Sequence, residues 1–494
     1  MRKVIIVGAG IAGLSAGVYA QQSGFDTTIL EMHAIPGGNC TSWRRRGYLF
    51  EGGLHWLTGS DAKQPLHKVW RNLGAIDETT KIFTRDPFFV LDHQGQQVCL
   101  YRDPDRLREH LIGISPEDEK AICALCADIK RFAKMSMPVM DIKGVRVTEK
   151  SGMPLSALFS MLPAVGKLSR YGKLPVDEYA QRFQCPAIRE LLHNVVGETF
   201  PATAMFFTLG TLASGDGGYL EGGSLEMTRK MADRFTSLGG EIRYSTRVQK
   251  VLAQDGKAIG VIADGERLPA DAVIVTADTR SAIDALFEGP LEESWTDRMR
   301  AQTKPMVCTF ISLGVAADLS DLPGSMVFSP QEPLVYAGKE HAALSFTHYA
   351  AYDGYAPQGC TAMTVILMGD TYAYWRAQRE AGRYEEEKQR IAGEVIGRLE
   401  QYIPKIKGKI AVTDVATPLT YERYCGTYHG SWMTLTDTGD KMTPYPTASE
   451  SIKHLYFAGQ RMQPPGGLPV AADSGRRAAQ HLCRDMDAVF QGMV

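Results

Sequence analysis

A glycine-rich turn between a strand and a helix is the feature that most constrains how this chain can fold. Residues 4–7 are all β-branched and predict a short buried strand, and the run Gly8-Ala9-Gly10-Ile11-Ala12-Gly13 separates them from a helical pattern over 14–22. In such a turn the first glycine permits a tight bend, the second lets the backbone approach a pyrophosphate, and the third lets the helix pack on the strand. The helix N-terminus then faces the negative charge. The sequence therefore predicts a dinucleotide-binding unit.

An acidic residue follows this turn at the expected distance. A second predicted strand, 27–30, ends at Glu31, which lies 23 positions after Gly8. At about this spacing a carboxylate binds the hydroxyls of an adenosine ribose, and it would repel a 2′-phosphate. The pattern favours FAD or NAD. No second glycine turn of this kind has a strand before it and a helix after it, so we expect one dinucleotide site and no separate nicotinamide domain.

The charge balance and the cysteine content indicate which partners and which cellular compartment to expect. The chain has 54 basic and 56 acidic residues, a net charge of −2, which gives no general attraction for a phosphate backbone, so nucleic acid is not an expected partner. Nine scattered cysteines suit a reducing compartment. Cys123 and Cys126 are interpreted as one face of a helix that opens at Ser115-Pro116, and no metal site is expected.

The chain shows no signal-peptide pattern and no apolar run of the roughly 18 residues that a membrane span needs. We therefore expect a cytoplasmic protein, with a peripheral membrane contact left open. The composition carries no signal for an oligomeric state.

Two further glycine motifs carry a resemblance to a known family. Gly37-Gly38-Asn39 and Gly47-Tyr48-Leu49-Phe50-Glu51-Gly52-Gly53-Leu54-His55-Trp56 follow the acid, and the chain ends with Tyr456-Phe457-Ala458-Gly459-Gln460 and Pro464-Pro465-Gly466-Gly467-Leu468-Pro469-Val470. With these motifs the sequence resembles the phytoene desaturase, carotenoid isomerase and retinol saturase group of flavoproteins, which are distant relatives of the amine oxidases. It departs from that group at Glu51, where Asp is usual, at Asn39, where Arg or Lys is common, and at Gln460. The resemblance implies FAD as the cofactor.

The nucleotide motif and the resemblance together predict the cofactor contacts. In the group, the double glycine touches the pyrophosphate, the 47–56 segment runs beside the isoalloxazine, and a valine at the place of Val248 reaches the adenine. A helix N-terminus after the last glycine loop would face the flavin, where negative charge grows on reduction. The expected FAD contacts are Gly8, Gly10, Ala12, Gly13, Glu31, Met32, Gly38, Asn39, Gly53, Leu54, His55, Trp56, Val248, Gly459, Gln460, Gly467, Leu468 and Val470.

His55 is the one catalytic candidate. Its segment is expected against the flavin, and a histidine can move protons near neutral pH. The alternative is that the backbone of this segment matters and the imidazole does not. His348 and His429 come next, although each is more typical of a hydrogen-bonded polar residue in a sheet or loop. The run Arg44-Arg45-Arg46 fits a solvated surface turn and a place near phosphate equally well.

We expect an α/β fold in which a Rossmann-like FAD-binding domain is interleaved with an α+β substrate domain, and the resemblance implies that the substrate domain contains a mixed sheet. Residues 1–74, 222–284 and 416–494 are assigned to the FAD-binding domain, and 75–221 and 285–415 to the substrate domain. The second insertion has β-rich runs over 306–315, 342–348 and 361–368, followed by a charged pattern that predicts one helix over 372–402.

A methionine-rich stretch, 132–173, suggests an apolar ligand. It contains Met135, Met137, Met140, Met153 and Met161 beside Lys167, Arg170 and Lys173. Methionines that fill an irregular apolar pocket are the preferred interpretation. The alternative is an interfacial helix through which a lipid leaves a membrane.

Three functions compete. The first is an FAD-dependent oxidoreductase that desaturates, saturates or isomerises carbon–carbon bonds of an apolar polyene or lipid-like small molecule. The second is a flavin amine oxidase, for which Lys304, Tyr428 and Trp432 could stand near the flavin. The third is a lipid-binding protein without chemistry, like the dissociation inhibitors of prenylated GTPases. Those proteins lack flavin, so an intact pyrophosphate turn and Glu31 disfavour that function.

Overall fold

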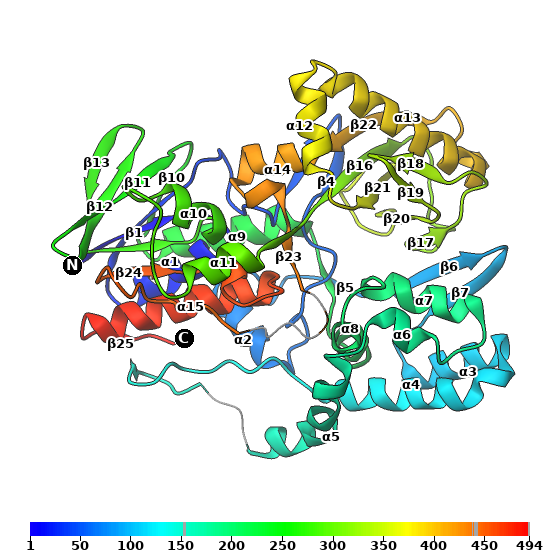
Figure 1. The fold of residues 1–494 in the computed structure, drawn as a ribbon, viewed down its shortest axis with the longest axis horizontal. Helices are drawn as coiled ribbons and strands as arrows, with labels where there is room; N and C mark the ends of the chain where they lie inside the picture. The colour runs from blue at the N-terminus through cyan, green and yellow to red at the C-terminus, as the bar shows by residue number, and fades with distance from the viewer. Residues whose placement is uncertain (152–154, 437, 439–442, 493–494) are drawn as a thin grey trace.

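A five-stranded parallel sheet forms one side of the molecule (Figure 1). The structure is a computed structural model that describes residues 1–151, 155–436, 438 and 443–492. All neighbouring strands of this sheet run parallel. Their order is β10 (Glu241–Arg243), β2 (Asp26–Leu30), β1 (Lys3–Val7), β14 (Ala272–Val275) and β24 (Leu455–Phe457). The Rossmann-like layer predicted from the first glycine turn is confirmed.

The two faces of this sheet are both buried, which is why its strands are continuous apolar runs. Val4 and Ile6 of β1 pack with the helices α1 (Ile11–Gln22), α9 (Gly223–Ser237) and α15 (Leu468–Asp485). Ile5 and Val7 point to the other face. That face is covered by α10 (Thr279–Ala285), α11 (Thr296–Gln302) and the antiparallel sheet of β11 (Val248–Gln254), β12 (Lys257–Ala263) and β13 (Glu266–Pro269).

A seven-stranded mixed sheet forms the second layer, as expected for the substrate domain. β6 and β17 run parallel, whereas the other neighbours are antiparallel. The order is β22 (Ile410–Ala416), β16 (Cys308–Val315), β21 (Thr361–Met368), β20 (Leu344–His348), β17 (Ser325–Phe328), β6 (Phe89–His93) and β7 (Gln96–Leu100). α12 (Tyr372–Glu380) and α13 (Tyr384–Tyr402) lie over it in Figure 1.

The single helix predicted over 372–402 is wrong. The chain forms α12 and α13, which are separated at Gly382, where φ is +70°. A glycine in this left-handed conformation ends α12 as a C-terminal cap, because it carries no Cβ to oppose a positive φ. The charge pattern on either side is helical, but it gave no sign of the break.

A bundle of short helices forms the third part. Its core is aromatic, with Phe206 stacked on Tyr171 at a centroid distance of 4.7 Å. Cys123 and Cys126 both lie on one of its helices, α4 (Glu119–Phe132), as interpreted, with Cys126 buried and Cys123 exposed. The helices are α3 (Pro104–Ile114), α4 (Glu119–Phe132), α5 (Leu155–Tyr171), α6 (Val176–Ala180), α7 (Pro186–Val196) and α8 (Ala202–Ala213).

Short elements join these parts. β23 (Met433–Leu435) pairs with β15 (Lys304–Met306), so the last segment of the chain is hydrogen-bonded to the second insertion. The others are β3 (Ser42–Arg45), β4 (Tyr48–Glu51), α2 (Pro65–Asn72), β5 (Ile82–Phe83), β8 (Arg146–Val147), β9 (Tyr219–Leu220), β18 (Leu334–Tyr336), β19 (Lys339–His341), α14 (Pro418–Cys425) and β25 (Val489–Phe490).

The strands of the parallel sheet come from 1–74, 222–284 and 416–494, and the boundaries of the two proposed domains stay a prediction. Among the described residues, no helix has the length and apolar character to span a membrane.

The packing of α1 on α15 allows a direct stability test. A Cβ on Gly475 of α15 would lie 2.3 Å from the Ala12 carbonyl oxygen and 2.8 Å from Ser15 Cβ. We therefore expect Gly475→Ala to force the helices apart and to cost about 1–3 kcal/mol, the range for overpacking. Thermal unfolding measures the loss.

Gly393→Ala is the matched control, because Gly393 is also inside a helix, α13, and has no atom within 4 Å of an added Cβ. Alanine is the better helix former, so this variant should gain up to about 1 kcal/mol. Two variants that shift the midpoint in the same direction would contradict the packing argument.

Candidate active site

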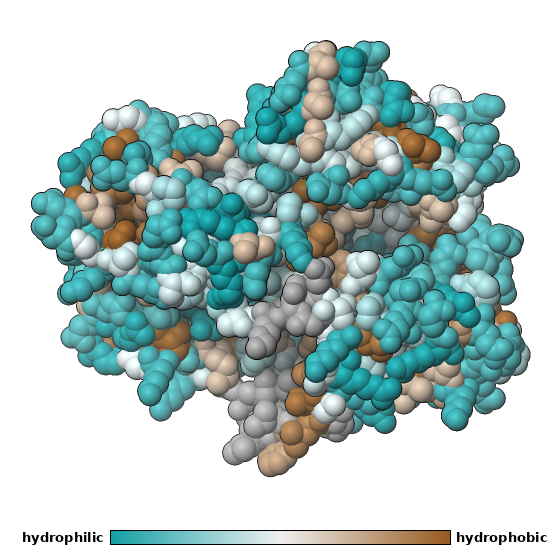
Figure 2. Space-filling model, in the orientation of Figure 1, coloured by the Kyte–Doolittle hydropathy of each residue, from teal (hydrophilic) through white to brown (hydrophobic). Residues whose placement is uncertain are grey.

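One large cavity lies where the three parts of the molecule meet. Its volume is about 1330 Å³, which exceeds the roughly 300–1,000 Å³ of an ordinary small-molecule pocket. It is lined at one end by the glycine turns of the parallel sheet, and at the other by α7, α8 and the inner face of the mixed sheet. Figure 2 shows the surface hollowed between the mixed sheet and the helical bundle. The cavity has room for a dinucleotide and a second ligand.

The residues predicted to contact a cofactor lie together in the wall of this cavity, with two exceptions. Gly13 is buried in α1 behind the turn, and Leu54 is fully buried with its amide hydrogen-bonded inside the protein. The lining residues are Gly8, Gly10, Ala12, Glu31, Met32, Gly38, Asn39, Gly53, His55, Trp56, Val248, Gly459, Gln460, Gly467, Leu468 and Val470. Their contacts with a ligand stay a prediction.

The first glycine turn has the geometry that a bound phosphate requires. Gly8 has φ +105°, a conformation that side chains rarely adopt, and a Cβ on Gly13 would lie 1.9 Å from the Gly8 carbonyl oxygen. Gly10 differs, since a Cβ there would meet only the Gly37 carbonyl oxygen, at 3.9 Å. The protein itself does not demand glycine at position 10, so the open space in front of Gly10 is available to a ligand.

Glu31 is held beneath this turn. Its carboxylate accepts hydrogen bonds from the amides of Ala9, at 2.6 Å, and His33, at 2.7 Å. Burial raises the pKa of Glu31, and these two amides act in the opposite direction. The side chain is 5% exposed and lines the cavity, so it links the turn to the end of β2, where a ribose would lie.

Several buried polar atoms in the cavity wall have no hydrogen-bond partner among the described residues. They include Asn39 Oδ1, His55 Nε2, Thr427 Oγ1 and Trp432 Nε1. Buried polar groups in native proteins are nearly always satisfied, so atoms of this kind facing a cavity indicate a polar ligand. α15 adds its N-terminus, since residues 467–471 line the same space.

His55 lies in an aromatic surround. Its ring centroid is 5.2 Å from that of Trp432 and 6.4 Å from that of Phe310, which is nearly parallel to it. Burial, together with the positive charge of Arg85, lowers the pKa of His55 to about 4. The imidazole is therefore neutral near pH 7, and it can accept a proton or donate one N–H but carries no charge.

Glu51 positions the His55 segment from behind. It is fully buried, and its carboxylate accepts five hydrogen bonds: from the amides of Gly53, Leu54 and Ser224 and the hydroxyls of Ser224 and Tyr219. A Cβ on Gly223 would lie 2.4 Å from Glu51 Oε2. The start of α9 can therefore lie this close to the carboxylate only because residue 223 is a glycine. The acid that departs from the resembled group thus contacts the protein backbone and does not line the cavity.

An ion pair beside the last glycine loop was not foreseen. Arg461 and Asp278 have side chains that are each 2% exposed, and they join at 2.6 Å while both line the cavity. Gln460 donates to the Trp432 carbonyl oxygen. Asp278 lies shortly after the end of the buried strand β14 (Ala272–Val275), a place where cofactor-binding residues often lie, and that position was the only signal in the sequence.

The other candidates lie away from the cavity. His348 Nε2 lies 3.2 Å from the Leu322 carbonyl oxygen, and His429 is stacked against Tyr372 and Tyr428. Of the three residues weighed for an amine oxidase, only Trp432 lines the cavity, and Lys304 is exposed on β15. The arginine run forms the β3–β4 hairpin, where Arg45 pairs with Asp414 at 2.9 Å, so it is a surface turn.

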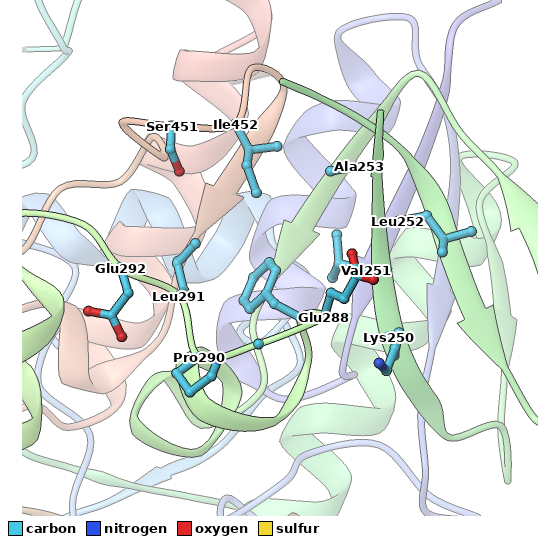
Figure 3. A pocket seen from close by; sticks show the side chains of 12 residues that line it. Lys250, Val251, Leu252, Ala253, Glu288, Pro290, Leu291, Glu292, Ser451 and Ile452 are labelled. Carbon is cyan, nitrogen blue, oxygen red and sulfur yellow. The ribbon is translucent and has the colours of Figure 1, made fainter. Parts of the chain in front are cut away.

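A second, smaller cavity of about 460 Å³ lies between β11 and the 287–292 loop (Figure 3). Leu252, Pro290 and Ile452 line it, together with Lys250, Glu288 and Glu292. No residue predicted from the glycine motifs and no unpaired buried polar atom of the described residues belongs to it. The large cavity is therefore the candidate active site.

Comparison with known proteins agrees with this assignment. The family model described as flavin containing amine oxidoreductase matches residues 11–483, nearly the whole chain. The chain belongs to the flavin containing amine oxidoreductase family. The unpaired polar atoms and the open space at Gly10 fit the flavin nucleotide that this family uses, so FAD is the cofactor.

The relatives of this flavoprotein include two phytoene desaturases. The phytoene desaturase (lycopene-forming) of Paracoccus sp. is 23% identical, with 98% of each chain covered, and the phytoene desaturase (neurosporene-forming) of Rhodobacter capsulatus is 26% identical, with 98% of this chain and 94% of the relative covered. The prolycopene isomerase of Daucus carota is 23% identical, with 98% of this chain and 80% of that protein covered.

Solved structures with this fold include amine oxidases. Putrescine oxidase bound to putrescine has a TM-score of 0.63 at 16% identity, covering 97% of this chain and 98% of that one. Cyclohexylamine oxidase from Brevibacterium oxydans has a TM-score of 0.62 at 13% identity, covering 98% and 99%. At such identities the likeness establishes the fold alone.

The space at Gly10 gives a test of the cofactor site. Gly10→Ala places a methyl group where the protein leaves room, so we expect the variant to fold like the wild type but to bind FAD about 10- to 100-fold more weakly, because the methyl group meets the pyrophosphate. FAD titration followed by flavin fluorescence measures the affinity. Gly113→Ala, at a helical glycine with no atom near an added Cβ, is the control. Unchanged FAD affinity in Gly10→Ala would contradict the assignment.

The low pKa of His55 makes stability depend on pH. Between pH 6.5 and about 4 the unfolded chain holds a proton on His55 that the folded protein does not, so this group destabilises the fold as the pH falls. We expect His55→Phe to remove up to about 1.4 kcal/mol per pH unit of that dependence. Urea unfolding at pH 7 and pH 5 measures it, and an equal loss in wild type and variant would contradict a buried neutral imidazole.

Proposed function

We propose that this flavoprotein is an oxidoreductase that desaturates, saturates or isomerises carbon–carbon bonds of an apolar polyene or lipid-like molecule. The observation that carries the proposal is the second end of the cavity, which continues past His55 between α7, α8 and the mixed sheet. The relatives named for phytoene and prolycopene support it, because their names describe polyene chemistry over nearly the full length of this chain.

The walls of that end suit a long apolar chain. Met135 and Met137, from the methionine-rich stretch, line the cavity, as do Phe200, Phe207 and Val327. Methionine side chains are flexible and fill irregular apolar space, so they can follow a bent substrate. Two of the methionines therefore agree with the pocket interpretation. Met140 does not line it, and Met153 and the side chain of Met161 lie outside the described residues.

FAD supplies hydride or electron transfer when it is bound. The protein contributes orientation and exclusion of water. Trp432 and Phe310 enclose His55, whose neutral imidazole can form a hydrogen bond at Nε2, whereas taking up a proton there would bury a charge, which the lowered pKa of His55 disfavours. The N-terminus of α15 presents partial positive charge to the cavity, which favours a cofactor that becomes more negative on reduction.

Neither alternative function has an observation of equal weight. An amine oxidase would need Lys304 close to the flavin, but Lys304 is exposed and is not part of the cavity wall. A lipid-binding protein without flavin has no need of Glu31 beneath a phosphate turn, nor of unpaired polar atoms at Asn39 and Thr427.

Purification under anaerobic conditions tests the proposal. The protein should carry FAD, visible as absorbance at about 450 nm, and mass spectrometry of an organic extract should identify a co-purifying polyene or lipid. A colourless protein that also fails to take up added FAD would overturn the proposed function. A polar amine in place of the lipid would favour the amine oxidase.

The substrate is further proposed to reach the cavity from a membrane surface at α5 and α8. Phe159, Leu162 and Val165 of α5 are 65%, 53% and 45% exposed, and Arg170 lies on the same helix. Phe207 of α8 is 44% exposed and also lines the cavity. Figure 2 has apolar side chains exposed along α5. Exposed apolar side chains beside cations are typical of a helix that lies in a membrane interface, so we propose a cytoplasmic protein with peripheral membrane contact.

Vesicle flotation tests this contact. The double variant Phe159→Ser/Leu162→Ser should bind vesicles of phosphatidylcholine and phosphatidylglycerol at least about 10-fold more weakly than the wild type, since each buried apolar side chain contributes about 1.5–3 kcal/mol. Val335→Ser/Val489→Ser, at exposed valines outside α5, is the matched control and should float like the wild type. Equal flotation of both double variants would contradict α5 as the contact.

A further inference from the structure

We propose that Arg85 binds an oxygen-bearing head group, a carboxylate above all, at one end of an otherwise apolar substrate. The inference rests on the proposed function and narrows its substrate class from pure hydrocarbons to polyenes or lipids with an acidic end. Arg85 lies in the loop between β5 and β6, and its side chain lines the large cavity beside Trp56 and Phe88.

The guanidinium of Arg85 is only partly engaged by the protein. Its Nη2 donates to the His55 carbonyl oxygen at 3.3 Å, and its Cζ lies 5.9 Å from the centroid of the Phe88 ring. It forms no ion pair with any residue in the described part of the chain. Arginine presents five N–H donors in a planar fork, so donors remain for a carboxylate.

The nearby carboxylates are engaged elsewhere. Asp86 pairs with Arg106 at 3.2 Å. Asp216 lines the cavity, but its oxygens accept hydrogen bonds from the Gly59 amide at 2.7 Å, the Ser60 hydroxyl at 2.9 Å and the Asp61 amide at 3.1 Å. Arg102 lies against the same aspartate and donates to its carbonyl oxygen. Among the residues that the structure describes, no carboxylate of the cavity wall is therefore paired with Arg85.

The positive charge of Arg85 affects the pKa values of titratable side chains around it. It contributes to lowering the pKa of His55 and of His348, in both cases after burial, and it opposes the rise that burial causes in the pKa of Tyr349 and Tyr352. These four residues come from two segments that lie far apart in the sequence, one at position 55 and one over 348–352. Arg85 thus makes this end of the cavity attractive to an anion.

Hydroxyl groups complete a polar end wall. A Cβ on Gly324 would lie 3.3 Å from Arg85 Cδ, so the arginine lies directly against the start of β17. The next residue, Ser325, accepts a hydrogen bond from Thr347 Oγ1 at 3.2 Å, and both side chains line the cavity with Ser345. An arginine and three hydroxyl groups lie at the end of an otherwise apolar channel. This arrangement suits a substrate with one polar end better than it suits a symmetrical hydrocarbon.

A fluorescent polyene acid and its neutral ester provide the test. The FAD-loaded protein is titrated with cis-parinaric acid and with methyl cis-parinarate, and binding is followed by energy transfer from tryptophan. We expect the wild type to bind the acid about 10- to 100-fold more tightly, the range for a charge-assisted hydrogen bond. Arg85→Met should lose this preference by weakening only the acid, and Arg85→Lys should keep part of it.

Lys68→Met removes an exposed cation outside the cavity and should leave both affinities unchanged. Equal affinity of the wild type for acid and ester would overturn the head-group site while leaving the proposed function intact, and this comparison needs no variant to fold. Equal weakening of both probes by Arg85→Met would overturn it too, because Arg85 would then act only through the His55 backbone. Failure of an FAD-loaded wild type to bind either probe would overturn both proposals.

Discussion

The buried carboxylate of Glu51 is the interaction on which the arrangement of the active site depends. It joins β4 and the 53–55 segment that follows it to Tyr219 and the start of α9, which lie 168 and 173 positions further along the chain. Tyr219 is in turn hydrogen-bonded to Tyr355, at 2.6 Å, so the network reaches the loop that follows β20 of the mixed sheet. Two layers of the molecule meet at this one side chain.

A buried charge is costly unless it is fully hydrogen-bonded, and here the folded chain supplies five donors. The partial positive charge at the N-terminus of α9 adds to them. Gly223 is needed for that approach, because any Cβ there would meet the carboxylate. Since the Gly53 and Leu54 amides are among the donors, the network fixes the backbone that carries His55 into the cavity. The resembled group usually has the shorter Asp at this position, and in this chain all five donors lie within hydrogen-bond distance of the longer Glu51 side chain.

The features that the sequence predicted are local or periodic. The phosphate turn and Glu31 depend on residues within one strand–turn–helix–strand unit, where spacing alone determines geometry. The β-rich runs indicated strands in the second insertion, and the resemblance to the desaturase group implied that they form a mixed sheet. The break at Gly382 was missed because the charge pattern is helical on both sides of it, and a left-handed glycine leaves no trace in periodicity.

The features that the sequence did not predict join distant residues. In the sequence nothing distinguishes Arg85 from the other basic residues. Only the fold shows that it lies against Gly324 and donates to the His55 carbonyl oxygen. Arg461 and Asp278 are separated by 183 positions, and Glu51 and Ser224 by 173. No spacing rule relates such pairs, because the chain between them passes through a second sheet. A single sequence therefore located the cofactor end of the cavity but not the polar group at its substrate end.

Anaerobic mixing of the FAD-loaded protein with polyenes, with and without an acidic end, tests the central claim most directly. The account predicts that mass spectrometry and chromatography will detect a desaturated, saturated or isomerised polyene, with loss of the absorbance at about 450 nm when the reaction reduces the flavin. No conversion of any polyene, together with flavin reduction by a primary amine, would contradict it.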